Sequence, residues 1–251
     1  MSGLLAQVTA VVVNYQTREL TRRAVETLLT HYPRLELIVI DNGSRDVSTT
    51  YVRELGDTIE NVTTILNTRN RYHGPALDQG IRAAATDFVL TLDSDCEVRR
   101  GGFLEAMLPA FADPDVYALG ELRYKNRFGY THSYGESARP KQSNRIPYIH
   151  PYAMLLRRRS YLELHPFVHH GAPCLKNMRD AQRHGLVVAD FRIADYVHHY
   201  LRGTSSDHGY GVRARARNVL EARANRLYGW FTGDPTVPIR VPLKKHDQDT
   251  T

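Results

Sequence analysis

The chain has 251 residues, which suits one domain with a substantial core, or one domain plus a small appendage. Its formal net charge of +6 would suit nucleic acid, an anionic lipid or an acidic carrier protein as a partner. The two cysteines, Cys96 and Cys174, form no spacing pattern, which argues against a disulfide framework and for a reducing compartment. We find no signal peptide at the start and no apolar run of membrane-spanning length, so we expect a cytoplasmic protein without a transmembrane segment.

The first half of the chain alternates between short apolar runs and amphipathic segments. Apolar runs rich in β-branched residues are typical of strands that are buried on both faces of a parallel sheet. Such runs predict strands at residues 8–13, 35–40, 62–66 and 88–92. The segments between them predict helices at residues 17–32, 47–55 and 75–85. This alternation predicts an α/β protein with a parallel sheet, right-handed crossovers and helices on both faces.

Polar side chains follow three of the predicted strands at the point where each strand ends. They are Asn14, Asp41 and the acidic pair in Asp93-Ser94-Asp95. The carboxyl ends of parallel strands meet at one edge of a sheet, and ligands bind there. Two carboxylates at this spacing can hold Mg2+ or Mn2+, with substrate phosphates completing the coordination. An isolated Asp-x-Asp can also be a polar turn, but three polar strand ends on one edge favour a ligand crevice.

Four blocks of the sequence resemble family 2 glycosyltransferases of the GT-A fold, and they occur in the order usual for that family. The blocks are residues 11–15, 36–44, 67–80 and 92–95. The similarity runs from about Val8 to Phe111 and thins beyond it. The resemblance implies a GT-A-type, mostly parallel sheet flanked by helices. It divides the chain into a Rossmann-like nucleotide-binding half at 1–111, an acceptor-binding half with a basic C-terminal helix at 112–235, and a tail at 236–251.

The resemblance also implies a nucleotide-sugar donor and a divalent cation, Mn2+ or Mg2+. The family's commonest donors make a UDP-sugar the first expectation, and thymidine diphosphate sugars stay open. Asp41 and Asn42 would hydrogen-bond the base, Asp93 would lie near the ribose and the metal, and Asp95 would be the main metal ligand. The predicted substrate-binding residues are Asn14, Asp41, Asn42, Arg71, Gly74, Asp78, Asp93 and Ser94.

Residues 70–80 resemble the family's glycine-containing segment, which opens a helix beside the nucleotide. Gly74 permits a close approach of the backbone. A helix N-terminus with Arg69 and Arg71 nearby favours the diphosphate. The alternative, in which Gly74-Pro75 is merely a helix start and the arginines are solvated, carries equal weight.

Residues 195–204 resemble a downstream segment that supplies a metal-ligating histidine in many GT-A enzymes. Histidine is a standard ligand for borderline cations. Strand alternation would point either His198 or His199 inward, but not both, and the sequence does not say which. Because the chain has 12 histidines, both could also be incidental residues of a half-buried strand.

The expected catalytic base is where this chain departs from the family. The acidic pair found downstream in inverting members is replaced here by Pro173-Cys174. An inverting reaction needs a base within reach of the acceptor hydroxyl. The candidates are Asp180, His169 or His170, and Glu121, and none stands out. A retaining mechanism, which needs no such base, is the alternative.

These features together predict a metal-dependent glycosyltransferase that acts on a hydroxyl or amine acceptor, which could be a small molecule, a carrier-bound group or a glycan. A sugar nucleotidyltransferase is the runner-up, but the glycine-rich phosphate loop expected after its first strand is missing at residues 14–18. A non-catalytic basic binding module is the third class. Two carboxylates buried in a pocket without a cation would be costly, which argues against it.

The second half of the chain suggests partners less clearly. Residues 212–228 predict a basic helix whose arginines face water, or which forms a homodimer contact or meets an anionic acceptor. The aromatic-rich residues 123–152 would select the acceptor or serve as an irregular connector. We expect no nucleic-acid partner.

Overall fold

The structure is a computed structural model that describes residues 5–125, 146–168 and 172–200. These residues fall within one compact unit, Met1–Leu201, and the remaining unit, Arg202–Thr251, lies outside the described residues. The predicted basic helix, the tail, His169 and His170 therefore lie outside them too. In the described ranges, no helix is both long enough and apolar enough to cross a bilayer.

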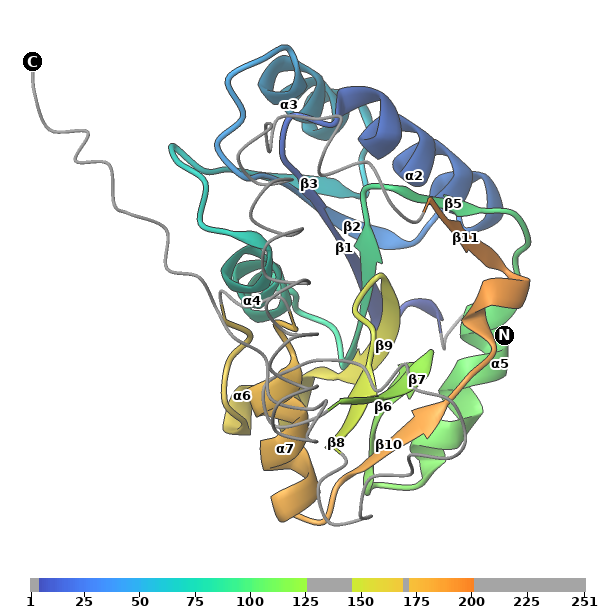
Figure 1. The fold of residues 1–251 in the computed structure, drawn as a ribbon. Coiled ribbons are helices and arrows are strands. Elements are labelled where there is room, and N and C mark those ends of the chain that lie inside the picture. The colour runs from blue at the N-terminus through green and yellow to red at the C-terminus, as the bar shows by residue number, and fades with distance from the viewer. Residues whose placement is uncertain (1–4, 126–145, 169–171, 201–251) are drawn as a thin grey trace, which may run out of the picture. The chain divides into compact units, whose positions relative to one another are not determined.

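The central sheet has seven strands in the order β10-β6-β9-β4-β1-β2-β3 (Figure 1). Its strands are β1 (Val8–Asn14), β2 (Glu36–Asp41), β3 (Val62–Leu66), β4 (Phe88–Asp93), β6 (Val116–Gly120), β9 (Ala153–Arg157) and β10 (Val187–Asp190). β9 runs antiparallel to both of its neighbours, β4 and β6, and the other pairs are parallel. The four predicted strands and the mostly parallel sheet are confirmed.

Two small antiparallel ribbons flank this sheet. One pairs β5 (Cys96–Val98) with β11 (Val197–His199), and the other pairs β7 (Leu122–Lys125) with β8 (Ile146–Ile149). The first ribbon joins segments about a hundred residues apart in the chain, and it begins directly after the acidic pair that follows β4. It therefore carries the histidine segment to the end of β4.

Helices cover both faces of the sheet. They are α2 (Arg18–His31), α3 (Ser48–Thr58), α4 (His73–Ala83), α5 (Phe103–Met107), α6 (Arg158–Glu163) and α7 (Leu175–Arg183), with 3-10 turns at Leu108–Ala112 and Ile193–Asp195. The predicted helices are confirmed, although α3 runs three residues further than expected and α4 begins two residues earlier.

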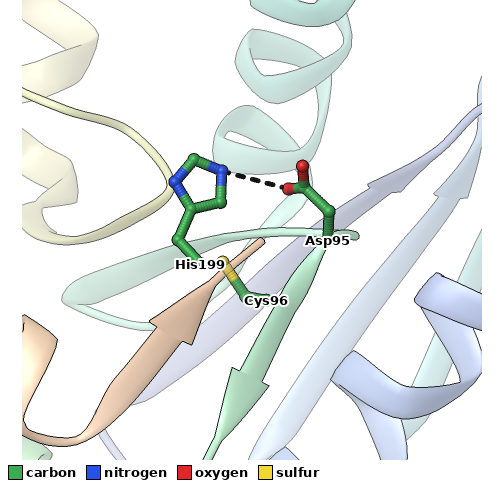
Figure 2. A group of neighbouring side chains, drawn as sticks. All are labelled: Asp95, Cys96 and His199. Atoms are coloured by element: carbon green, nitrogen blue, oxygen red, sulfur yellow. Dashed lines mark ion pairs between the residues drawn. The ribbon is translucent and has the colours of Figure 1, made fainter. Parts of the chain in front are cut away.

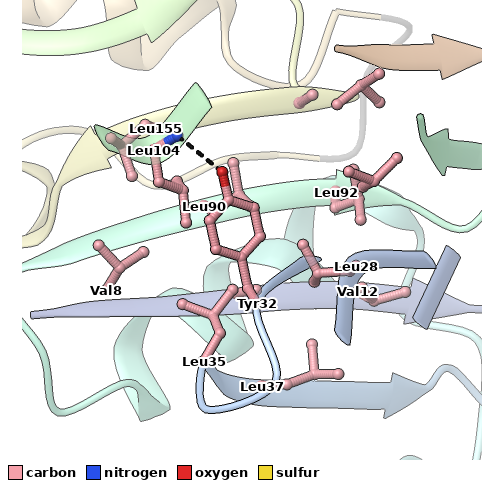
Figure 3. Packing of buried hydrophobic residues seen from close by; sticks show 14 of the residues in the cluster. Val8, Val12, Leu28, Tyr32, Leu35, Leu37, Leu90, Leu92, Leu104 and Leu155 are labelled. Atoms are coloured by element: carbon pink, nitrogen blue, oxygen red, sulfur yellow. Dashed lines mark hydrogen bonds between the residues drawn. The ribbon is translucent and has the colours of Figure 1, made fainter. Parts of the chain in front are cut away.

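Alternate residues of the strands form two separate cores, because successive side chains of a strand point to opposite faces. Val12 of β1 packs with Leu28 of α2, Val52 of α3 and Phe103 of α5 on one face. Figure 3 shows the centre of that core, where the Tyr32 hydroxyl accepts a hydrogen bond from the backbone N–H of Leu104 at 3.2 Å. The second core packs strand residues against α4, α6 and α7 on the other face; among its members are Val11, Ile40, Leu77, Tyr161 and Met178.

Candidate functional site

The carboxyl ends of β1, β2 and β4 lie at one edge of the sheet. Asn14 of β1 is in register with Asp41 of β2, and Val13 of β1 is in register with Asp93 of β4. The prediction that these polar strand ends share an edge is confirmed. This edge is where a doubly wound sheet binds its ligand.

Asn14 and Asp41 form a buried hydrogen-bond network at this edge. Asn14 is completely buried, and its amide donates to Asp41 Oδ1 at 2.7 Å. The other carboxylate oxygen, Oδ2, accepts from the Ser44 backbone N–H at 3.2 Å and from the Thr49 hydroxyl at 2.8 Å. Three donors of the chain itself thus surround Asp41, which is 1% exposed. The predicted contacts of Asn14 and Asp41 with substrate are not tested by this geometry and stay predictions.

Asn42 holds the segment that precedes α4. Its side-chain oxygen accepts hydrogen bonds from the Arg71 backbone N–H at 3.0 Å and from the Asn67 amide at 3.2 Å. Next to it, Gly43 has a φ of +78°, and a Cβ there would lie 2.4 Å from the backbone carbon of Arg69. Glycine is needed both for that φ and for that close approach. The loop is therefore fixed on the end of β2, and the side chain of Arg71 is exposed.

Two acids and two histidines meet where β4 ends, and we refer to Asp93, Asp95, His73 and His199 as the acid–histidine cluster. His199 Nε2 lies 3.2 Å from Asp95 Oδ1 and 4.0 Å from Asp93 Oδ2. His73, at the start of α4, places its Nε2 3.2 Å from Asp93 Oδ1. Figure 2 shows the His199 imidazole facing the Asp95 carboxylate across the β5–β11 ribbon.

Electrostatic attraction between acids and histidines shifts the pKa of three groups in the cluster, namely Asp93, His73 and His199. Burial would raise the pKa of Asp93, but the imidazole of His73 and two further imidazoles outweigh it and lower that pKa. Desolvation would lower the pKa of His73, but the Asp93 carboxylate outweighs it and raises that pKa. For His199, burial is outweighed by Asp95 and Asp93, and the pKa is raised. The cluster thus favours charged acids beside cationic groups.

The β5–β11 ribbon decides between the two candidate histidines. His199 is paired with Cys96 and His198 with Glu97, so the two imidazoles leave the ribbon on opposite faces. The His199 side chain is 14% exposed and reaches the acids, whereas the His198 ring packs edge-on against Tyr200. The prediction that one of the two points inward is confirmed, and that one is His199. Whether either residue binds a metal stays a prediction.

Three site residues were not singled out from the sequence. His73 stands inside the resembling block, but only the packing of α4 against β1 and β2 brings it to Asp93. Tyr152 stacks on His199, with ring centroids 4.6 Å apart and planes within 6°. His150 packs 5.8 Å from the His199 ring, and desolvation lowers its pKa to about 4. His150 and Tyr152 precede the antiparallel strand β9, and no local pattern in the sequence reveals that pairing.

Three other predicted binding residues contact the protein itself. A Cβ on Gly74 would lie 2.2 Å from the Val168 carbonyl oxygen, so the close approach at this glycine is made by the chain's own backbone. Asp78 accepts a hydrogen bond from the Tyr161 hydroxyl at 2.6 Å and pairs with Arg82, on the side of α4 that faces α6. Ser94 accepts a hydrogen bond from the hydroxyl of Thr17 at 3.3 Å. Their roles toward a ligand stay predictions.

The two candidate bases also have partners within their own surroundings. Glu121 pairs with Arg123 at 2.8 Å, and Asp180 accepts a hydrogen bond from the His165 backbone N–H at 3.0 Å. Glu121 also interacts with the Tyr152 side chain, whose ring stacks on His199, so it lies one residue away from the acid–histidine cluster. A role for Glu121 or Asp180 as the base stays a prediction.

The cluster has the chemistry of a cation site. Asp93 Oδ1 is buried, and in the contacts of the described residues the imidazole of His73, with Nε2 at 3.2 Å, is the group that meets it. A buried carboxylate oxygen of this kind is costly unless a cation or donor meets it. Asp95 and His199, with Cys96 beside them, bring three possible ligand atoms within 4.8 Å of one another. The residues present therefore fit a divalent cation.

Comparison with known proteins agrees with this geometry. The sequence profile of glycosyl transferase family 2 matches residues 9–178, well beyond the limit near Phe111 that we expected for the resemblance. No curated protein matches the chain. A solved structure of the mannosyltransferase PcManGT from Pyrobaculum calidifontis, in complex with GDP-Man and Mn2+, aligns with a TM-score of 0.57 at 20% identity, covering 74% of this chain and 54% of that one.

A second solved structure is TarS residues 1–349 from S. aureus in complex with UDP-GlcNAc. It aligns with a TM-score of 0.56 at 15% identity, covering 87% of this chain and 65% of that one. At these identities the two structures show a shared fold, and this chain spans about half to two thirds of their lengths. The predicted GT-A-type architecture is confirmed. Since the family profile covers most of the residues from the first strand to the last long helix, the chain belongs to glycosyl transferase family 2.

Proposed function

We propose that this protein catalyses metal-dependent transfer of a sugar from a nucleoside-diphosphate sugar to a hydroxyl or amine acceptor. The acid–histidine cluster carries the proposal: at the ligand-binding edge of the sheet, His199 Nε2 lies 3.2 Å from Asp95 Oδ1 and 4.0 Å from Asp93 Oδ2. The structural neighbours support it, because PcManGT is described in complex with GDP-Man and Mn2+ and TarS in complex with UDP-GlcNAc.

Asp93, Asp95 and His199 would hold the cation. When bound, Mn2+ or Mg2+ would neutralise the diphosphate and so help the nucleoside diphosphate to leave the anomeric carbon. Arg71 lies next to this edge on the segment that Asn42 anchors, and its exposed guanidinium suits the diphosphate. These residues would bind and orient the donor, and His73 would neutralise Asp93 in the absence of the cation.

The identity of the donor base is the finer part of the proposal. We propose a UDP-sugar, the donor type expected from the family, and TarS is described with a donor of this class. A contact between Asp41 and the base would use the remaining acceptor site of its carboxylate on Oδ1, or would displace one of the three donors that now surround it. The acceptor would be a small molecule, a carrier-bound group or a glycan.

The proposal is tested by calorimetric titration of UDP, TDP and GDP into the protein with Mn2+, and again with a chelator. We expect one nucleotide to bind in a metal-dependent manner. Replacing even an outer-shell partner of a metal ligand costs about 10–100-fold in metal affinity, so Asp95→Asn should weaken this binding at least about tenfold.

Asp57→Asn is the matched control, because Asp57 is an exposed residue of α3 away from this edge. It should bind the nucleotide as the wild type does. Absence of binding for all three nucleotides would contradict a donor site and would revive the non-catalytic binding module. Binding that is indifferent to both chelator and Asp95→Asn would contradict the metal. Transfer of a nucleotidyl group instead of a sugar would favour the nucleotidyltransferase.

A further inference from the structure

Cys96 is a buried thiol that stands directly beside the proposed cation site. It follows Asp95 in the chain and lies opposite His199 in the β5–β11 ribbon. Residues directly opposite each other in an antiparallel pair project from the same face, with Cβ atoms about 4.5–5.5 Å apart. The thiol and the imidazole therefore share the face of the ribbon that meets Asp95, as Figure 2 shows.

The three ligand atoms are close enough for one cation. The carboxylate oxygen of Asp95, Sγ of Cys96 and a ring nitrogen of His199 all lie within 4.8 Å of one another. The separation of 3.2 Å between His199 Nε2 and Asp95 Oδ1 is close to the edge, about 3.3 Å, of a tetrahedron with metal–ligand bonds of about 2.0–2.1 Å.

Simple packing is the competing explanation for Cys96, because a free cysteine is often a small core residue. Cys96 is 1% exposed and packs at the margin of the core on the α2 face. Its environment is not purely apolar, however. The thiol donates to the Tyr152 carbonyl at 3.5 Å, and its sulfur lies within 4.8 Å of a carboxylate oxygen and an imidazole nitrogen, both of which are metal-ligand types.

We propose that Cys96 is a fourth protein ligand of this cation site, together with Asp93, Asp95 and His199, and that it sets the site's preference among cations. On binding, the sulfur–metal bond replaces the S–H bond and the thiol proton passes to water. A mixed sulfur, nitrogen and oxygen donor set suits Zn2+ or Co2+, whereas Mg2+ prefers oxygen ligands in an octahedron. The inference rests on the proposed cation site and adds the residue that distinguishes soft from hard cations.

Cobalt titration tests this directly, because thiolate coordination to Co2+ produces a charge-transfer absorption band in the near ultraviolet that oxygen and nitrogen ligands do not. Co2+ alone is added to the full chain, and absorption and heat are recorded together. We expect the band in the wild type and in Cys174→Ser, and its loss in Cys96→Ser. Cys174 is the matched control, since it is the other cysteine of the chain and is also buried.

Affinity gives a second measurement. Outer-shell changes already cost about 10–100-fold in metal affinity, so loss of a direct ligand in Cys96→Ser should weaken Zn2+ binding at least about tenfold. Mg2+ binding should stay within about threefold of the wild type, because oxygen ligands provide it. The expected result is therefore a changed ratio of the two affinities rather than a uniform loss.

The inference is overturned if Co2+ binds without the band, if Co2+ does not bind, or if the band persists in Cys96→Ser. If Cys96→Ser does not fold, Cys174→Ser decides alone, because Cys96 is then its only thiol. Failure here leaves the proposed function intact when Mn2+-dependent nucleotide binding is still observed. Failure of that nucleotide binding, with the cobalt band present, would instead leave a metal site without a donor site.

Discussion

Asn14→Ala is expected to destabilise the protein by removing the centre of the network at the sheet edge. The Asn14 amide nitrogen donates to Asp41 Oδ1 at 2.7 Å and to the Ser44 hydroxyl at 3.1 Å. Its oxygen accepts from Thr21 at 2.8 Å and from Thr17 at 3.2 Å. Because Asn14 itself is 0% exposed, water cannot replace its side chain at these partners without rearrangement.

The magnitude follows from the groups that are left behind. Asn14 is the donor to Asp41 Oδ1 among the hydrogen bonds of the described residues. Its removal leaves a buried carboxylate oxygen without a donor, which costs about 1–3 kcal/mol or more. Thr21 keeps a hydroxyl neighbour in Thr17, at 3.3 Å, so it loses less. Adding the cavity left by the side chain, we expect a loss of about 2–4 kcal/mol in the free energy of unfolding.

Urea unfolding measures this loss. The denaturant slope rises with chain length, and with a slope of about 3 kcal/mol/M the midpoint should fall by about 1 M at constant slope. Thr49→Val removes a single donor to Asp41 Oδ2, which keeps the Ser44 backbone donor, and should cost about 1 kcal/mol. Arg22→Ala, which breaks exposed ion pairs, should cost less than about 0.5 kcal/mol. An Asn14→Ala variant no less stable than Thr49→Val would refute the reasoning.

Three further changes probe other parts of the molecule. His199→Ala should weaken Mn2+ binding at least about tenfold, as measured by calorimetry, because His199 reaches Asp95. His198→Ala should leave Mn2+ affinity within about threefold of the wild type, because His198 packs against Tyr200 instead. Equal small effects of the two variants would remove both histidines from the site. Gly74→Ala should lower the free energy of unfolding by about 1–3 kcal/mol, because its Cβ would meet the Val168 backbone. Gly101→Ala should be nearly neutral, because its Cβ would meet only the His31 side chain, at 3.3 Å. Equal urea midpoints for the two variants would count against the contact between Gly74 and Val168. Burial raises the pKa of Tyr32 to about 12 from its usual 10. As the pH rises, the phenol therefore loses its proton in the unfolded chain before it does so in the folded protein. The free energy of unfolding should consequently decline between about pH 10 and pH 12. A shift of two pKa units corresponds to about 3 kcal/mol, so Tyr32→Phe should have a shallower alkaline decline, and identical pH profiles would contradict the assignment.

The local pattern of apolar residues was sufficient to predict strands β1 to β4 and the sheet edge at which the site lies. The runs at β1, β2 and β4 are apolar on both faces, a pattern typical of a buried parallel strand. Once those strands are parallel, their carboxyl ends must meet, so the neighbourhood of Asn14, Asp41 and Asp93 follows from the sequence. Alternation in a strand likewise required that His198 and His199 face opposite ways.

Tertiary structure decided what surrounds the acids. β9 enters the sheet between β4 and β6 in the antiparallel direction, and the residues before it, His150 and Tyr152, reach His199 only because of that pairing. The β5–β11 ribbon pairs Cys96 with His199 across about a hundred residues, a register that no short-range periodicity encodes.

The residues that contact Gly74 and Asp78 could not be predicted from the sequence either, because they too are distant in the chain. Gly74 and Asp78 have the residue types expected for ligand contacts, yet Val168 and Tyr161, distant in the chain, are what lie against them. Periodicity reports which face of an element is apolar, but not which other element will cover it. The sequence by itself determined strands β1 to β4, their parallel direction and the acidic edge. The long-range pairing of elements determined which histidine, which thiol and which aromatic ring stand beside that edge.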